Sequence, residues 1–173
     1  MSALSNLLNT YRSSSVTERE KGTYFEELTL CYLRHEATYR DLYSDVWTYG
    51  DWAELQGLDK RDAGIDLVAK TAGTGEYHAI QCKLYATDYK LQKKDIDSFF
   101  TASGKRPFTH RIIVTTTNEW SVHAEESLRD QHIPVDQTQY LLVNPAVQRF
   151  EEMVRLQLNR HIFDDAVIDE DSA

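Results

Sequence analysis

Two short segments hold the residues best suited to chemistry: Asp66 in GIDLVAK, and Gln81, Cys82 and Lys83 in AIQCKLY. Mg²⁺ prefers hard oxygen ligands, which the Asp66 carboxylate and the main-chain carbonyl of Cys82 would supply; Mn²⁺ is the alternative ion. A metal held there would polarise a phosphoryl oxygen and lower the pKa of a bound water. The ammonium of Lys83 would orient that water and offset charge in the transition state. This residue set therefore suits metal-assisted hydrolysis of a phosphodiester.

A predicted β-hairpin would bring these residues together. Residues 64–70 and 76–85 read as strands around the turn signal Ala72-Gly73-Thr74-Gly75. A two- or four-residue loop centred on this turn places Asp66 directly opposite Gln81, with Lys83 diagonally across on the same face. A three-residue loop would separate them. The ordinary alternative is a solvent-facing side of a sheet. The other face, expected to pack into the core, comprises Ile65, Leu67, Ile80 and Cys82.

A helix over residues 17–36 is predicted by the capping box from Thr17 to Glu20 and by the helical spacing of the apolar residues that follow. It carries two acids, Glu26 and Glu27, and either one could complete the metal shell through water.

The other predicted elements alternate between helix and strand. This order indicates an α/β domain with a central mixed β-sheet flanked by helices. The expected elements are a short helix near Leu4–Tyr11, strands 46–49, 111–116 and 140–143, and helices 90–103, 121–130 and 145–159.

Net charge neither supports nor opposes a nucleic-acid role. The chain carries −9, but its last ten residues, DDAVIDEDSA, hold five acids, so residues 1–163 hold 23 acids against 19 bases. The segment from Lys83 to Arg111 contains seven basic residues and three acidic residues. This basic stretch suits phosphate contact, although an ordinary solvated helix face would look the same.

The cysteines and the hydropathy of the chain bear on disulfides, zinc sites and cellular location. The two cysteines, Cys31 and Cys82, are too few for a disulfide framework, and no Cys/His group has zinc spacing. Cys82 alternates away from Lys83 and has no neighbouring base, so a buried apolar role is expected rather than a nucleophilic one. No apolar run reaches membrane-spanning length and no signal peptide is evident, so we expect a cytoplasmic protein.

The chain resembles a known nuclease family. The segments KGTYFEELTLCYL, VWTYGDWAEL, GIDLVAK, YHAIQCKLY and DSFFTASG are similar to the Mrr-like branch of the PD-(D/E)xK nucleases. More narrowly, they resemble the N-terminal nuclease domain of the single-polypeptide Type I-like (Type ISP) restriction–modification enzymes. The likeness runs from about Gly22 to Val143, and GIDLVA followed by AIQCK is its specific part. It implies a restriction-endonuclease-like fold and a Mg²⁺-dependent endodeoxyribonuclease.

Carried over by position, the resemblance assigns roles to four residues. Asp66 is the metal-binding acid, Gln81 stands where the family has its second acid, Lys83 is the catalytic lysine, and Glu26 is the helical acid. Two departures are Ile65 in place of the motif proline, and Gln81, which removes one charge from the metal site. In the following helix, Lys93, Lys94 and Ser98 are the expected DNA contacts.

The resemblance also suggests how the domain is used. We expect a nuclease domain over residues 1–163, with its core at about 17–160, and an acidic linker or tail at 164–173 leading to further domains. These would be a helicase-like translocase, a methyltransferase and a target-recognition domain. One domain would nick one strand of double-stranded DNA, and two domains pairing transiently would break both. The alternatives are a structure-specific junction nuclease, and a degenerate nuclease fold used only for DNA binding or docking.

Overall fold

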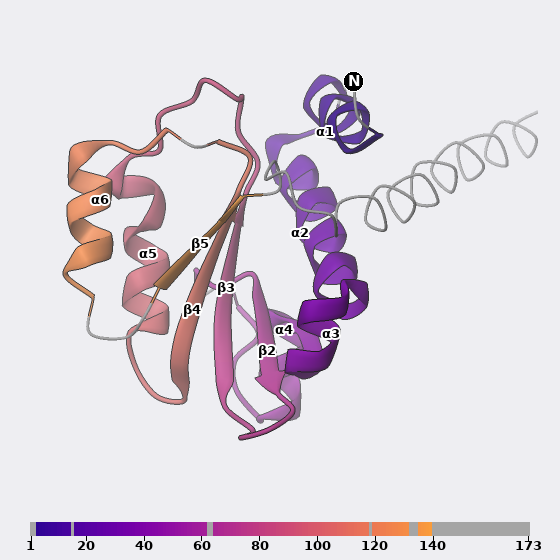
Figure 1. Ribbon diagram of the computed structural model, residues 1–173, viewed down its shortest axis with the longest axis vertical. Coiled ribbons are helices and arrows are strands. Elements are labelled where there is room, and N and C mark those ends of the chain that lie inside the picture. The colour runs from indigo at the N-terminus through magenta and orange to yellow at the C-terminus, as the bar shows by residue number, and fades with distance from the viewer. Residues whose placement is uncertain (1–2, 15, 62–63, 118, 132–134, 140–173) are drawn as a thin grey trace, which may run out of the picture. The chain divides into compact units, whose positions relative to one another are not determined.

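The computed structural model describes residues 3–14, 16–61, 64–117, 119–131 and 135–139 (Figure 1). The chain forms two compact units, Met1–Val16 with Val143–Ala173, and Thr17–Leu142. The described part of the first unit is helix α1 (Ala3–Ser13), which confirms the expected opening helix. Its apolar residues Leu7, Leu8 and Tyr11 are buried. The second unit contains the sheet and all the residues proposed for chemistry.

A five-stranded mixed sheet forms the centre of the second unit, in the order β1-β2-β3-β4-β5. Antiparallel pairs join β1 (Tyr43–Thr48) to β2 (Leu67–Thr71) and β2 to β3 (Tyr77–Lys83). Parallel pairs join β3 to β4 (Phe108–Thr115) and β4 to β5 (Val135–Gln139). The expected α/β class and mixed sheet are confirmed.

The β2–β3 hairpin has the predicted register. Leu67 pairs with Ile80 and Lys70 with Tyr77, and the N–H of Thr71 donates to the carbonyl of Glu76. The loop therefore has four residues, Ala72–Gly75, which is one of the two lengths that give the predicted register. Both strands are shorter than predicted, however, because β2 begins at Leu67 and β3 ends at Lys83.

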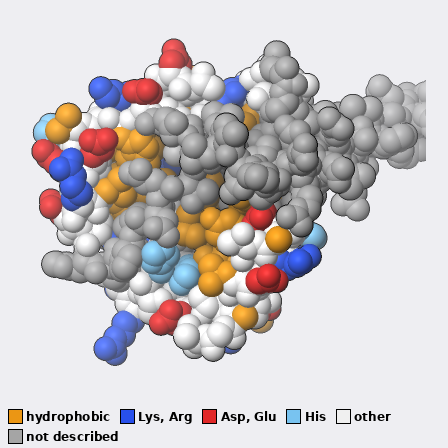
Figure 2. All heavy atoms as spheres, in the orientation of Figure 1, with side chains coloured by type: hydrophobic (Ala, Val, Ile, Leu, Met, Phe, Trp, Pro, Cys, Tyr) orange, Lys and Arg blue, Asp and Glu red, His pale blue; other side chains and the backbone are white. Residues whose placement is uncertain are grey.

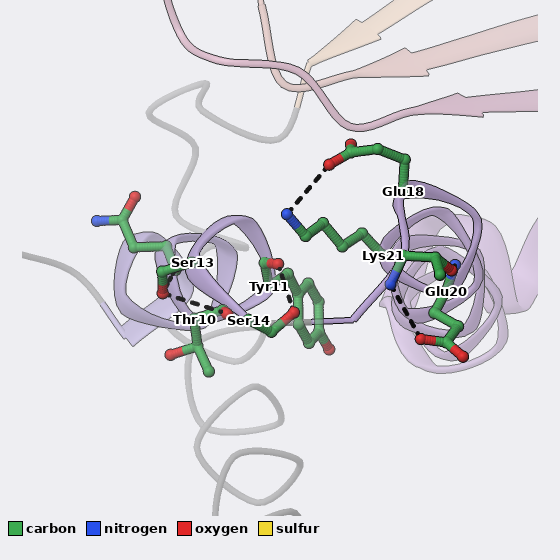
Figure 3. Close-up of polar contacts among 9 residues, drawn as sticks. Thr10, Tyr11, Ser13, Ser14, Glu18, Glu20 and Lys21 are labelled. Carbon is green, nitrogen blue, oxygen red and sulfur yellow. Dashed lines mark hydrogen bonds and ion pairs between the residues drawn. The ribbon is translucent and has the colours of Figure 1, made fainter.

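Helix α2 (Glu18–His35) begins at the predicted capping box. The hydroxyl of Thr17 accepts from the N–H of Glu20, and the Glu20 carboxylate accepts from the N–H of Thr17. In the same turn, the Nζ of Lys21 donates to the carboxylate of Glu18 (Figure 3). At the other end, Arg34 donates two hydrogen bonds, of 3.1 and 2.7 Å, to the carbonyl of Val46 in β1. These contacts fix where α2 begins and how its last turns lie against the sheet.

The remaining helices cover the sheet. Figure 1 shows α5 (Lys93–Ser103) and α6 (Val122–Arg129) side by side, and the two helices contact one another. Short helices α3 (Ala37–Leu42) and α4 (Tyr49–Leu55) flank β1 in the chain. Helix α4 was not predicted from sequence, because VWTYG read as a strand ending in a turn. No helix within the described residues is both long and apolar enough to span a bilayer.

The core lies between α5 and one face of the sheet. Hydrophobic side chains gather near the middle of the face in Figure 2, with most charged side chains toward its margin. The continuous apolar run of β4 is buried from Arg111 to Thr115, as its composition predicted. The buried cluster comprises Trp52, Ala53, Ile65, Val68, Ala79, Leu91, Ile96, Phe99, Phe100, Phe108, Ile113 and Ala124.

The strand and helix predicted for the C-terminal part of the chain do not correspond to strand β5. Strand β5 occupies 135–139, a segment to which no strand was assigned. The predicted strand 140–143 and helix 145–159 lie outside the described residues. The sequence VDQTQ has no apolar alternation, so only its pairing with the buried strand β4 reveals it as a strand.

Candidate active site

Asp66 is held against the backbone of β3. Its Oδ2 accepts a 2.7 Å hydrogen bond from the N–H of Cys82. Its own N–H donates to the carbonyl of Ile80, and its carbonyl accepts from the N–H of Tyr49 at the start of α4. Because three main-chain partners fix this residue, its half-buried carboxylate has a defined position at the end of the hairpin.

The carbonyl of Cys82 points to the same edge of β3 as this carboxylate. The N–H and C=O of one residue in an extended strand leave on the same side, and the N–H of Cys82 points to Asp66. Consistent with this alternation, the carbonyl of Lys83 points to the opposite edge, where it accepts from the N–H of Thr116. Two oxygen donors suited to a hard cation therefore lie along the same edge of β3.

Gln81 supplies a third oxygen. Its side chain is 3% exposed, and its Oε1 has no hydrogen-bond partner among the described residues. A buried amide oxygen without a partner is destabilising unless a water or an ion satisfies it. The donor set of Asp66, Gln81 and the Cys82 carbonyl therefore fits a hard divalent cation such as Mg²⁺.

The pKa of the Cys82 thiol is shifted by burial and by the charged groups that lie near it. Burial raises its pKa well above the ordinary value, and the negative charges of Asp66 and Glu26 raise it further. A hydrogen bond from Thr29 and the positive charge of Lys83 act in the opposite direction. The thiol is thus a buried, protonated group, as expected, and the predicted acid, lysine and helical acid all lie close enough to act on it.

Strand alternation distributes these residues over two faces. Gln81 pairs with Ile113, so it faces α5 together with the buried cluster, and Lys83 follows on that face. Cys82 points to the opposite face, toward Thr29 of α2. Glu26, one helical turn before Thr29, therefore approaches the end of β3 from the α2 side.

The prediction that Asp66 pairs directly with Gln81 was wrong in detail. The ladder ends at Leu67, and the Asp66 N–H bonds to Ile80 instead. Ile65 consequently joins the buried cluster on the α5 side, although alternation from Leu67 predicted the other face. The irregularity arises because the chain leaves β2 at this point to contact both α4 and β3.

Gly64 allows the chain to depart from the β2 ladder before Leu67. Its φ is +86°, and a Cβ added there would lie 2.9 Å from the backbone carbon and oxygen of Ser98 in α5. A side chain would suffer both backbone strain and a steric clash. Ser98 therefore serves as a packing surface for the segment that leads into Asp66.

The three residues predicted to contact DNA differ in whether their side chains can reach a phosphate. Lys93 and Lys94 are exposed at the N-terminal end of α5, but the Nζ of Lys93 bonds both carboxylate oxygens of Asp97, at 2.9 and 3.0 Å. Ser98 is exposed on the same helix. Lys94 is consequently the better candidate for a phosphate contact.

Two cavities lie apart from the candidate residues. A cavity of about 440 Å³ lies near Trp52 and Phe108, and one of about 600 Å³ lies between α5 and α6; neither is lined by Asp66, Gln81 or Lys83. No group of three or more His, Cys, Asp and Glu residues with metal-binding geometry occurs within the described ranges. The donor set contains an amide and a carbonyl, so it lies outside that definition.

Sequence reasoning missed Thr29 and Gly64. Thr29 follows Glu26 by three residues, which places both on one face of α2, and this spacing could have indicated that the face meets the site. Gly64 lies within the segment 64–70 that was predicted as a strand, and a glycine in a strand pattern often marks close backbone approach.

Comparison with known proteins decides the family. The profile of a family described as restriction endonuclease matches residues 34–154. The chain belongs to this restriction endonuclease family. The matched range covers the hairpin, α5 and the parallel strands, and therefore includes Asp66, Gln81 and Lys83.

A solved structure at 31% identity agrees with this restriction endonuclease assignment. The chain is similar to the ATP-dependent Type ISP restriction–modification enzyme LlaBIII bound to DNA, with 31% identity over 79% of this chain and a TM-score of 0.57. A second match, MspJI restriction endonuclease in complex with an oligonucleotide, has 14% identity over 79% of this chain and a TM-score of 0.43. The chain spans 8% of the first protein's length and 29% of the second's. No curated protein matches the chain.

Proposed function

We propose that this restriction endonuclease domain is a Mg²⁺-dependent endodeoxyribonuclease that nicks one strand of double-stranded DNA. The observation that carries the proposal is the 2.7 Å hydrogen bond from the Cys82 N–H to Asp66. This bond brings the predicted acid to the strand that carries Gln81 and Lys83. The resemblance to the Type ISP enzyme supports DNA as the substrate.

Asp66, the Cys82 carbonyl and Gln81 Oε1 would hold the cation, with Glu26 acting through water. A divalent ion bound there would polarise the phosphoryl group and lower the pKa of a water. Gln81 in place of an acid leaves one negative charge fewer in this set, so we expect weaker cation binding than a second carboxylate would give.

Lys83 would supply the positive charge beside the reacting phosphate. Its side chain is half-buried and lies one residue beyond the Cys82 carbonyl, on the same face as Gln81. An ammonium at this position would orient the attacking water and stabilise negative charge that develops in the transition state. Arginine or lysine contacts elsewhere bind the duplex without selecting its sequence.

One domain carries one such site, so it would cut one strand. Double-strand breaks would need two domains acting together, as expected for a nuclease joined to a translocase, a methyltransferase and a target-recognition domain. An isolated domain that linearised plasmid with no nicked intermediate would contradict this part of the proposal.

The direct test is nicking of supercoiled plasmid with Mg²⁺ at high enzyme concentration. Wild type should nick, and Asp66→Ala and Lys83→Ala should not. Two controls remove the same side-chain types from other parts of the same unit: Asp45→Ala in β1, and Lys70→Ala at the far end of β2. Both should retain activity.

Two other outcomes of the nicking assay would each support a different conclusion. Cleavage that survives Asp66→Ala and Lys83→Ala would place the site elsewhere. A wild-type domain that binds DNA yet never nicks, also when joined to its natural neighbours, would support the docking module instead.

A further inference from the structure

We infer that Thr116 is a positioning residue for Lys83, an inference that rests on the proposed nuclease function. The N–H of Thr116 donates a 3.2 Å hydrogen bond to the carbonyl of Lys83. Its hydroxyl accepts from the N–H of Tyr85 and donates to the carbonyl of Tyr85, both at 2.8 Å. One buried threonine thus binds the chain at Lys83 and again two residues later.

The need for such a contact follows from where β3 ends. Lys83, paired with Thr115, is the last residue of the β3–β4 ladder. A strand end without further main-chain partners would fray, and Lys83 would be part of it. The Thr116 hydroxyl replaces the missing ladder bonds, so the backbone that sets the direction of the Lys83 side chain is held on both sides.

The loop after Lys83 is braced at a second point. The hydroxyl of Thr117 donates to the carbonyl of Tyr89 at 2.6 Å. The rings of Tyr85 and Tyr89 stack with centroids 4.2 Å apart, and the Tyr89 hydroxyl donates to Asp95 at 2.8 Å. Asp95 also accepts from the N–H of Gln92 at the start of α5. The contacts therefore run without interruption from Lys83 to the N-terminal end of α5.

Thr116→Val tests the inference, because valine keeps the shape and removes both hydroxyl bonds. We expect its single-turnover nicking rate at saturating DNA to fall about 10- to 100-fold, since small misplacements of catalytic groups have effects of this size. DNA affinity measured without metal should not change. Thr116→Ser keeps the hydroxyl and should restore the rate.

The matched control is Thr71→Val. Thr71 is also buried, and its hydroxyl also accepts from a backbone N–H, that of Glu76 at 2.9 Å, but at the opposite end of the hairpin. Thr71→Val should lose about as much unfolding free energy as Thr116→Val, but it should keep the wild-type nicking rate. Equal slowing in Thr71→Val, or no recovery in Thr116→Ser, would reduce Thr116 to an ordinary structural residue.

A readout independent of cleavage separates this inference from the proposed function. The NMR order parameters of the backbone amides from Lys83 to Tyr85 should fall in Thr116→Val and stay unchanged in Thr71→Val. Unchanged values in Thr116→Val would overturn the inference even if wild type nicks DNA. Failure of the proposed function would appear differently, as nicking that is absent or insensitive to Asp66→Ala.

Discussion

The backbone N–H of Cys82 donates a 2.7 Å hydrogen bond to Oδ2 of Asp66, across the end of the β2–β3 hairpin. The bond has two consequences. It fixes the carboxylate on the edge of β3 to which the Cys82 carbonyl points, and it makes Asp66 contribute to folding as well as to the proposed chemistry. Substitutions at this position can therefore separate the two roles.

Asp66→Asn should remain folded and lose activity. The amide oxygen of asparagine still accepts from Cys82, but the negative charge needed by the cation is gone, so nicking should fall about 1,000-fold. Asp66→Ala should additionally lose about 1–2 kcal/mol of unfolding free energy, because it leaves the Cys82 N–H unpaired. Denaturant titration and plasmid nicking measure the two effects. Equal activity of Asp66→Asn and wild type would exclude Asp66 as the metal acid.

Gln81→Glu should make stability depend on metal. Without a cation, a carboxylate buried at this position costs more than the neutral amide, because it is either charged without a partner or must take up a proton. The melting temperature in EDTA should therefore fall. Added Mg²⁺ should raise it more than in wild type, because the second negative charge strengthens cation binding. Gln56→Glu, on an exposed residue, is the control and should show no Mg²⁺ effect. Mg²⁺-independent melting of Gln81→Glu would contradict the ligand set.

Gly64→Ala should displace the segment that positions Asp66. The positive φ and the 2.9 Å approach to Ser98 leave no room for a Cβ, and the backbone strain alone costs about 1–3 kcal/mol. We expect reduced unfolding free energy together with slower nicking. Gly22→Ala is the opposite case, because nothing lies within 4 Å of its added Cβ in α2. That variant should gain about 0.5–1 kcal/mol and keep its activity.

Lys94→Ala should weaken DNA binding through its charge. Loss of one phosphate contact lowers the slope of log affinity against log salt by about 1. Lys93→Ala should change the slope less, because Asp97 already binds that ammonium. Fluorescence anisotropy across a salt series measures both, with Lys70→Ala as control. Equal slopes for Lys94→Ala and wild type would exclude Lys94 as a phosphate contact.

The buried Cys82 thiol should make the domain less stable in alkali. Its folded-state pKa is raised by burial and by the charges of Asp66 and Glu26, so the folded state retains a proton that the unfolded state releases above about pH 8.5. The resulting stability is complete below that pH and is lost as pH rises toward the folded-state pKa. Unfolding free energy at pH 7 and 9.5 should therefore fall more in wild type than in Cys82→Ala. Cys31→Ala controls for the other cysteine and should behave as wild type.

The sequence alone was sufficient for local features whose causes are local. The capping box predicted the start of α2 with Thr17 as its N-cap, and the turn signal at Ala72–Gly75 predicted a loop of two or four residues and with it the observed register of β2 and β3. The continuous apolar run at Arg111–Thr115 indicated a buried strand. These features depend on backbone dihedral preferences and side-chain periodicity, which neighbouring residues determine.

Tertiary contacts decided the rest. Asp66 leaves its ladder because distant segments, α4 and Ile80 of β3, take its main-chain hydrogen bonds. The approach of Gly64 to Ser98 and the bonds from Thr116 to Lys83 and Tyr85 join residues about thirty positions apart. Strand β5 lacks apolar alternation and is recognised only by its pairing with β4. No periodicity or turn signal encodes such contacts, because the energy that selects them comes from packing and hydrogen bonding between segments that meet only in the folded chain.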